Sequence, residues 1–185
     1  DRKFLPSRNV RGRVGVAFSS GFFGFFAHAG FLAALREMNI VPVAFAGASS
    51  GAIVAAMAAS EMGNDEIRAL LFNVNKDDFW DPDPLPAFLK NALQLFRGYT
   101  GYLRGDGFAE LLKKLPAKRF EECRYPLALS AVDITHRKEK IFVKGDLVKA
   151  IQASGSVPVL FKPTKINGAL YLDGGISGKV PVEAL

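Results

Sequence analysis

The stretch VAFAGASSGAIVAAMAAS, from Val43 to Ser60, places two glycines and two serines between a short apolar run and a long alanine-rich one. Core packing alone does not require such residues there, whereas a sharp turn that presents a side chain does. Gly47 to Gly51 match the pattern G-x-S-x-G between a predicted strand and a predicted helix, which is the context of a nucleophile elbow. We therefore predict that Ser49 is a nucleophile between the motif glycines Gly47 and Gly51. The alternative is a buried turn that only lets a helix pack closely on a strand.

Predicted strands and helices alternate along the chain around this elbow. Short apolar runs bounded by turn residues predict strands at 13–20, 41–47, 125–134 and 138–144 and a hairpin at 165–175. Apolar periodicity and capping signals predict helices at 26–40, 50–63, 64–75, 108–115 and 146–156, with caps at Asn64 and Asp146. This order predicts one α/β domain over residues 1–185, with a mainly parallel sheet and helices on both faces.

Composition and charge limit the classes of function. The net charge is +6, from Lys and Arg scattered along the chain, and no nucleic-acid motif accompanies them, so we expect no nucleic-acid partner. Val14 to Leu35 and Ile40 to Ser60 carry no charge over a membrane-spanning length. Turn residues inside each stretch favour a buried strand and helix over a membrane hairpin. The single Cys123 cannot form an internal disulfide, which fits a reducing compartment. We expect a location that is cytoplasmic or peripheral to a membrane.

A serine hydroxyl needs a base that accepts its proton, and the chain offers few candidates. His28 and His136 are its only histidines. An α/β-hydrolase has its histidine after its catalytic acid, and no histidine follows His136. We interpret His28 as a packed or hydrogen-bonded residue of its helix, which favours a carboxylate as the base. The rival enzyme is a Ser–His acyltransferase in which His136 is the base.

Four segments, in one order, carry a resemblance to a known family: SSGFFGFFAHAGFLAAL from Ser19, GASSG from Gly47, ASGSVPVLFKP from Ala153 and YLDGG from Tyr171. From about Val14 to Val182 the chain resembles the patatin-like phospholipases. The resemblance implies a three-layer α/β/α fold and a lipid acyl hydrolase acting on lipid or phospholipid, without metal or organic cofactor. It also implies a Ser–Asp dyad in which Ser49 is the nucleophile and Asp173 is the base, followed by the motif glycines Gly174 and Gly175.

The same resemblance implies an oxyanion hole made of backbone N–H groups in the early glycine-rich loop, here Ser20, Gly21 and Phe22. The N-terminal N–H groups of the helix after the elbow would help to hold the negative charge. The chain departs from the family at Phe23, where a basic residue is common, but backbone donors need no side chain. It also lacks the asparagine-rich tail and ends at Leu185, earlier than most members, so we expect part of the sheet or lid to be absent.

Residues 76–107 have the loosest pattern, with prolines, glycines and aromatic residues around one short predicted helix at 87–96. Long loops of this kind are often functional, and we interpret this one as a lid whose Trp80 contacts a membrane surface. The alternative is an amphipathic segment that only covers the core. Four phenylalanines are candidates for lining an acyl pocket, with core packing as the alternative: Phe22, Phe23, Phe25 and Phe26. A catalytically silent lipid-binding module of the same fold is the non-enzymatic alternative.

Overall fold

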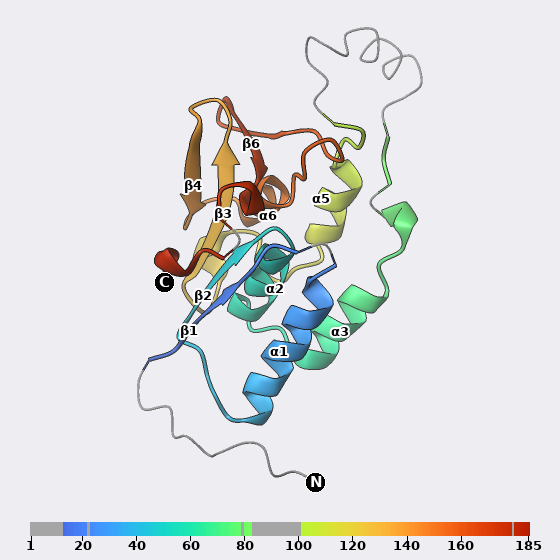
Figure 1. Cartoon of the computed structure of the whole chain (residues 1–185). Coiled ribbons are helices and arrows are strands. Elements are labelled where there is room, and N and C mark those ends of the chain that lie inside the picture. The colour runs from blue at the N-terminus through green and yellow to red at the C-terminus, as the bar shows by residue number, and fades with distance from the viewer. Residues whose placement is uncertain (1–12, 22, 79, 83–100, 179) are drawn as a thin grey trace, which may run out of the picture.

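The structure is a computed structural model that describes residues 13–21, 23–78, 80–82, 101–178 and 180–185 (Figure 1). Phe22, the predicted helix at 87–96 and most of the predicted lid lie outside the described residues. Trp80 is described: its side chain is 40% exposed, and its ring centroid lies 5.6 Å from that of Tyr102. Its contact with a membrane stays a prediction.

The described strands all belong to one sheet: β1 (Gly15–Phe18), β2 (Ala44–Ala48), β3 (Leu127–Asp133), β4 (Lys138–Phe142), β5 (Thr164–Ile166) and β6 (Ala169–Asp173). The described α-helices are α1 (Phe25–Glu37), α2 (Ser50–Ala59), α3 (Asn64–Phe72), α5 (Asp106–Leu112) and α6 (Leu147–Ser154). Short 3-10 helices are η1 (Lys76–Asp78), η2 (Phe120–Glu122), η3 (Gly174–Ile176) and η4 (Val182–Ala184). Each predicted strand or helix in this part of the chain corresponds to one of these elements.

The register of the sheet positions the site. β1, β2 and β3 are parallel, β4 and β6 pair antiparallel with β3, and β5 pairs antiparallel with β6, so that β1, β2, β3 and β5 point the same way. β2 pairs with β3 up to Ala48 opposite Ser130, and β6 pairs with β3 from Asp173 opposite Ala131. β4 occupies the other edge of β3 over 129–133. β2 and β6 therefore share one edge of β3 and meet there end to end.

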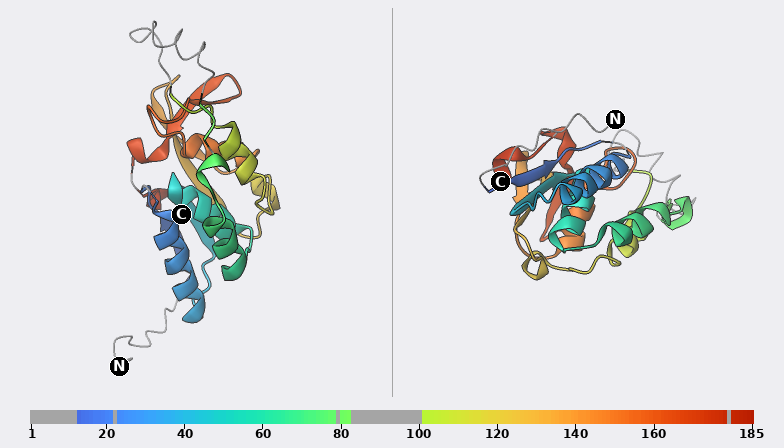
Figure 2. Two further views of the ribbon diagram at one scale, coloured as in Figure 1. Left: turned by 90° about the vertical axis from the view of Figure 1, so that its right-hand side faces the viewer. Right: turned by 90° about the horizontal axis from the view of Figure 1, so that it is seen from below.

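The helix α2 forms the centre of the core. Nine of its 10 residues are buried, and it packs on β1, β2 and β3. Its many alanines leave little side-chain bulk between helix and sheet, which lets the two backbones approach closely. α6 packs beside it on β3, β5 and β6. α1 packs on α2, α3 packs against α1, and α5 covers α6 (Figure 2).

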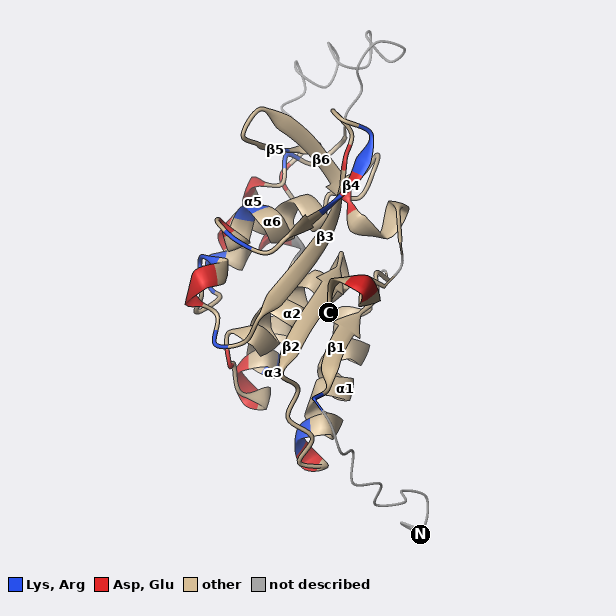
Figure 3. Ribbon diagram, turned by 90° about the vertical axis from the view of Figure 1, so that its left-hand side faces the viewer, with Lys and Arg blue, Asp and Glu red and all other residues tan. Residues whose placement is uncertain are grey.

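The side of the sheet away from these helices carries the C-terminal 3-10 helix η4, next to which Leu185 contacts Gly15 of β1 (Figure 3). The predicted α/β class is thus confirmed: the sheet is mixed, its strands run mostly in one direction, and helical segments flank it, consistent with the three-layer α/β/α form. None of the described helices combines the length and the apolar character needed to cross a membrane.

Helix caps show one correct prediction and one error. The Asp146 side chain caps α6 by accepting a hydrogen bond from the Lys149 N–H, as predicted. The cap predicted at Asn64 is wrong, because Gly63 is the N-cap of α3 and Asn64 is its first helical residue. The Gly63 N–H donates to the Glu66 carboxylate at 2.6 Å, so an acidic residue in the first turn satisfies the backbone instead.

Substitution by alanine should have opposite effects on the stability of the protein at two helical glycines, Gly51 and Gly30. A Cβ atom at Gly51 would lie 2.4 Å from the Phe18 carbonyl oxygen, so we expect Gly51→Ala to destabilise the protein by about 1–3 kcal/mol through overpacking. Among the described residues, no atom lies within 4 Å of the Cβ position at Gly30 in α1. Gly30→Ala should therefore stabilise the protein by up to about 1 kcal/mol through helix propensity. Urea unfolding measures both, and effects of the same sign would contradict the close contact between α2 and β1.

Candidate active site

Ser49 lies in the turn between β2 and α2. Its backbone has φ 55° and ψ −122°, a conformation that residues other than glycine rarely adopt. A Cβ atom at Gly47 would lie 2.4 Å from the Gly51 carbonyl oxygen, and Gly51 itself touches the end of β1. Close packing of strand and helix therefore explains both motif glycines. It does not explain the strained Ser49 backbone, which presents the hydroxyl at the end of the strand.

The Asp173 carboxylate lies against this hydroxyl. Ser49 Oγ donates a hydrogen bond to Asp173 Oδ2 at 2.5 Å, across 124 residues of sequence. The contact follows from the sheet register, because the ends of β2 and β6 meet on one edge of β3. The other carboxylate oxygen, Oδ1, accepts the Gly175 N–H at 2.7 Å, which fixes the orientation of the carboxylate. The structure thus brings together the two residues predicted as nucleophile and base.

Burial changes the proton affinity of Asp173. The residue is only 6% exposed, and loss of solvent around the carboxylate raises the pKa of Asp173 above its usual value. Hydrogen bonds from Ser49 and Gly175 stabilise the charged form and offset part of this rise. The net effect is an aspartate that binds a proton more tightly than an exposed one, which makes it a stronger base.

Gly174 and Gly175 let the Asp173 turn approach two neighbouring segments. A Cβ atom at Gly174 would lie 2.3 Å from the Ser130 carbonyl oxygen on β3. At Gly175 it would lie 2.6 Å from the Ser20 side chain, in the loop between β1 and α1. The second glycine therefore places the Asp173 turn directly against the predicted oxyanion loop.

That loop carries Ser20 and Gly21 from β1 into α1. The Gly24 N–H donates to the Gly21 carbonyl at 2.9 Å, which closes a turn, and Gly21 lines the same cavity as Ser49. His28 Nε2 lies 2.9 Å from the Ser19 carbonyl oxygen, so the imidazole anchors the start of the loop. This agrees with the interpretation of His28 as a hydrogen-bonded residue of its helix.

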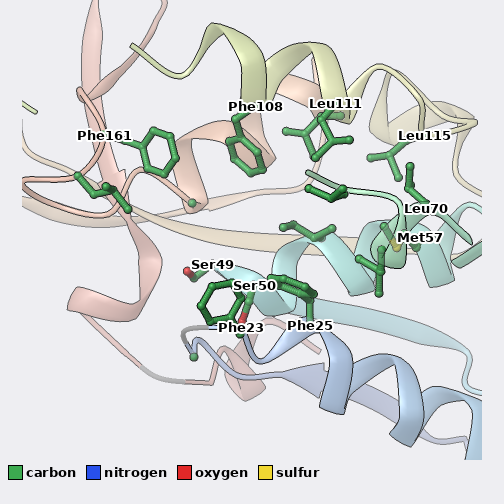
Figure 4. Close-up of a pocket in the computed structure, with 17 residues that line it drawn as sticks. Phe23, Phe25, Ser49, Ser50, Met57, Leu70, Phe108, Leu111, Leu115 and Phe161 are labelled. Atoms are coloured by element: carbon green, nitrogen blue, oxygen red, sulfur yellow. The ribbon is translucent and has the colours of Figure 1, made fainter. Parts of the chain in front are cut away.

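A cavity of about 200 Å³ begins at Ser49 and is lined almost entirely by carbon atoms (Figure 4). One wall is the face of α2 from Ser50 to Met57, and α5 covers the opposite wall. The aromatic lining residues are Phe23, Phe25, Phe108 and Phe161, and Met57 and Leu70 are among the aliphatic ones. Phe23 and Phe25 thus line this cavity as predicted, whereas Phe26 is absent from its lining and is 41% exposed.

His136 lies in the turn between β3 and β4. Its Nδ1 lies 2.8 Å from Asp133 Oδ2, and its backbone N–H donates to Asp133 Oδ1 at 2.9 Å. These bonds lower the pKa of the Asp133 carboxyl, although the desolvation of that carboxyl opposes them. The structure therefore pairs His136 with Asp133 and Ser49 with Asp173. In the described part of the chain, no three His, Cys, Asp or Glu side chains are grouped so that they could hold a metal ion.

Two contacts to the site from the C-terminal end of α6 were not predicted from the sequence. The Ser49 N–H donates to Ser154 Oγ at 2.9 Å, and the Asp173 N–H donates to the Ser156 carbonyl at 3.0 Å. The only signal in the sequence is ASGSVP at Ala153, which belongs to the family resemblance and by itself predicts no contact. Neither contact could be predicted from local pattern, because both join residues far apart in the sequence.

Comparisons with known sequences agree on one family. A model of the patatin-like phospholipases matches residues 16–185. An NTE family protein of Mycobacterium tuberculosis is 28% identical over 176 residues, which are 94% of this chain and 45% of that protein. Lysophospholipase NTE1 of Yarrowia lipolytica is 27% identical over 176 residues, 93% of this chain and 12% of that protein. The chain thus spans less than half the length of these relatives.

Two solved structures share the fold. VipD from Legionella pneumophila aligns with a TM-score of 0.63 and 16% identity over 89% of this chain and 46% of that one. A chain from the complex of SpcU with ExoU of Pseudomonas aeruginosa aligns with a TM-score of 0.53 and 14% identity, over 79% and 38% respectively. At these identities the likeness concerns the fold alone. The family model, by contrast, matches the sequence from β1 to Leu185, and the chain belongs to the patatin-like phospholipase family.

Proposed function

We propose that the chain is a serine lipid acyl hydrolase, of the phospholipase A or esterase type, that cleaves carboxylic ester bonds of lipids. The observation that carries the proposal is the 2.5 Å hydrogen bond from Ser49 Oγ to Asp173 Oδ2 at the end of an apolar cavity. Family membership and a relative named as a lysophospholipase support the same reaction. The reaction uses the two side chains and water, without metal or organic cofactor.

The proposed reaction proceeds through an acyl-enzyme. Asp173 accepts the hydroxyl proton while Ser49 Oγ attacks the ester carbonyl carbon, and the carbonyl oxygen takes the negative charge. Collapse of this intermediate breaks the bond to the alcohol, which leaves with the proton from Asp173. Water then attacks the acyl-serine and gives its proton to Asp173. The second collapse releases the fatty acid and returns that proton to Ser49.

The oxyanion needs donors other than the Ser49 N–H, because that N–H already donates to Ser154 Oγ. We assign the role to backbone N–H groups of the loop at Ser20 and Gly21, and the third position expected from the family is Phe22. The loop borders the cavity beside Ser49. The first N–H groups of α2 have no partner within their helix and add positive potential at the same point.

The cavity favours an acyl chain as the bound part of the substrate. Burial of each methylene group contributes about 0.8 kcal/mol, and the carbon-lined walls offer almost no partner to a polar group. A chain that fills the cavity from Met57 toward Ser49 would place its ester carbonyl at the nucleophile (Figure 4). A polar headgroup would then remain at the mouth.

Specific contacts weigh against the two alternatives. A Ser–His acyltransferase needs His136 at the nucleophile, but the His136 ring is bonded to Asp133 and its side chain is 61% exposed. A silent lipid-binding module would have the same cavity but no use for a strained serine bonded to a buried carboxylate. Such strain in the Ser49 backbone is typical of functional positions.

The dyad is tested by three variants and a soluble p-nitrophenyl ester. Ser49→Ala and Asp173→Asn should each lower kcat/KM at least about 1,000-fold, because nucleophile and base act as a unit. His136→Gln, at an exposed turn, should keep at least about a tenth of the activity. The reverse pattern, with His136→Gln inactive and Asp173→Asn active, would support the acyltransferase. A parent protein that binds lipid without turnover would support the silent module.

The raised pKa of Asp173 predicts the pH dependence of activity. Catalysis needs the carboxylate, so the acid limb of kcat/KM should lie above the ordinary aspartate pKa of about 3.9. The stability of the fold should instead decrease as pH rises through the pKa of Asp173 in the folded state. The folded state binds this proton more tightly than the unfolded state, so protonation stabilises the fold and deprotonation removes that contribution. Asp173→Asn should thus melt higher than the parent at neutral pH. An acid limb at or below the ordinary value would contradict this account.

An aromatic surface adjoins the cavity. It consists of Phe26, Arg68 and Phe72, on α1 and α3. The ring centroids of Phe26 and Phe72 lie 5.1 Å apart, Phe72 is 70% exposed, and the Arg68 guanidinium lies 6.0 Å from the Phe72 centroid. Phe25 lines the cavity, and its ring centroid lies 4.5 Å from that of Phe26, so this surface is continuous with the cavity lining. We propose that the aromatic surface contacts the lipid layer that supplies the substrate.

Vesicle binding tests this surface. The double variant Phe26→Ser and Phe72→Ser should bind anionic phospholipid vesicles at least about tenfold more weakly, since a large apolar side chain can contribute more than 1 kcal/mol. Hydrolysis of a short soluble ester should change little, because neither side chain lines the cavity. Phe31→Ser is the control, as Phe31 is 52% exposed on α1 but packs near Phe18 instead. Parental vesicle binding by the double variant would contradict the proposal.

A further inference from the structure

One short segment holds the backbones of both dyad residues. It comprises Ser154, Gly155 and Ser156, at the C-terminal end of α6. Ser154 Oγ accepts the Ser49 N–H at 2.9 Å, and the Ser156 carbonyl accepts the Asp173 N–H at 3.0 Å. The nucleophile and the base are thus attached to points two residues apart on the same piece of chain.

The segment is rigidly placed. Ser154 is 0% exposed and Ser156 is 2% exposed. Ser156 Oγ donates to the Gln152 carbonyl at 2.8 Å and lies 2.8 Å from Thr164 Oγ1, which ties the segment to its own helix and to β5. Since α6 also packs on β3, β5 and β6, the position of the segment is fixed by the sheet that carries Asp173.

The Ser49 backbone depends on an acceptor from outside its own helix. Ser49 is the N-cap of α2, and the N–H groups at a helix start have no acceptor within the helix. A buried N–H without an acceptor is costly, and Ser154 Oγ supplies the acceptor. The bond also opposes relaxation of the strained φ of 55°, which would turn Ser49 Oγ away from Asp173.

We propose that Ser154 is a positioning residue: its hydroxyl oxygen holds the strained Ser49 backbone so that Oγ stays in line with Asp173 and with the ester carbonyl. Its catalytic consequence rests on the proposed hydrolase function. Ser154 itself does not line the cavity, so it acts through Ser49 and not through the substrate. The Ser156 carbonyl holds the Asp173 backbone in the same way. Because this acceptor belongs to the backbone, a substitution of the Ser156 side chain does not remove it.

Turnover of a soluble ester tests the role of Ser154. Ser154→Ala should lower kcat about 100-fold, the effect of a misplacement near 1 Å, with KM and the acid limb unchanged. Ser154→Thr keeps a hydroxyl oxygen and should restore most of the loss. Thr164→Val is the matched control, because it also removes a buried hydroxyl bond, to Ser156 Oγ. Ser156 Oγ keeps its bond to the Gln152 carbonyl, and Ser154 Oγ and the Ser156 carbonyl keep their bonds to the dyad backbones. Thr164→Val should lower the melting temperature comparably and keep kcat within about threefold.

Amide hydrogen exchange gives a second result that does not require turnover. The Ser49 amide should be protected in the parent and in Thr164→Val and exchange at least about tenfold faster in Ser154→Ala, while the Asp173 amide stays protected. If Ser154→Ala does not fold, Ser154→Cys, with a weaker acceptor, makes the same comparison. Parental kcat and a protected Ser49 amide in the variant would overturn the inference. If the three proteins show this exchange pattern but the parent hydrolyses no ester, the proposed hydrolase function is refuted, whereas the contact between Ser154 and the Ser49 backbone is supported.

Discussion

The site depends on one constraint, the sharing of a single edge of β3 by β2 and β6. β2 ends opposite Ser130 and β6 ends opposite Ala131, the next residue along β3. Residues in a strand advance by about 3.3 Å, so the two strand ends lie within side-chain reach of each other. Ser49 follows the end of β2 and Asp173 is the last residue of β6, and their hydrogen bond follows from that placement.

Close backbone approach brings Ser49 and Asp173 within hydrogen-bonding distance, at a cost in stability. Cβ atoms at Gly47, Gly51, Gly174 or Gly175 would each lie less than 3.0 Å from a neighbouring atom, so larger residues would separate the strands, the helix and the loop. The strained Ser49 backbone and the buried Asp173 carboxylate both oppose folding. The helix α2 is almost wholly buried, packs against α1 and α6, and shares one apolar core with Ile67 and Leu71 of α3. This core stabilises the fold and offsets these costs.

The local features of the site could be predicted from sequence, and the long-range ones could not. Glycine spacing and the strand–turn–helix pattern predict Ser49 as a nucleophile, and the family resemblance predicts Asp173 as its base; the structure places the two side chains in contact. Nothing in the sequence shows that β6 runs antiparallel to β3, because pairing partners are chosen by the whole sheet. The Ser154 contact is likewise a tertiary one. Even the local cap predicted at Asn64 lies one residue earlier, at Gly63, because the Gly63 N–H donates to the Glu66 carboxylate.

The central claim is that the Asp173 carboxylate activates the Ser49 hydroxyl. The most direct measurement is the rate and position of covalent labelling by an alkyl fluorophosphonate, with the modified peptide identified by tandem mass spectrometry. The account predicts a single adduct on Ser49 in the parent and labelling at least about 100-fold slower in Asp173→Asn. An adduct on Ser50 or elsewhere, or an equal labelling rate in Asp173→Asn, would contradict it.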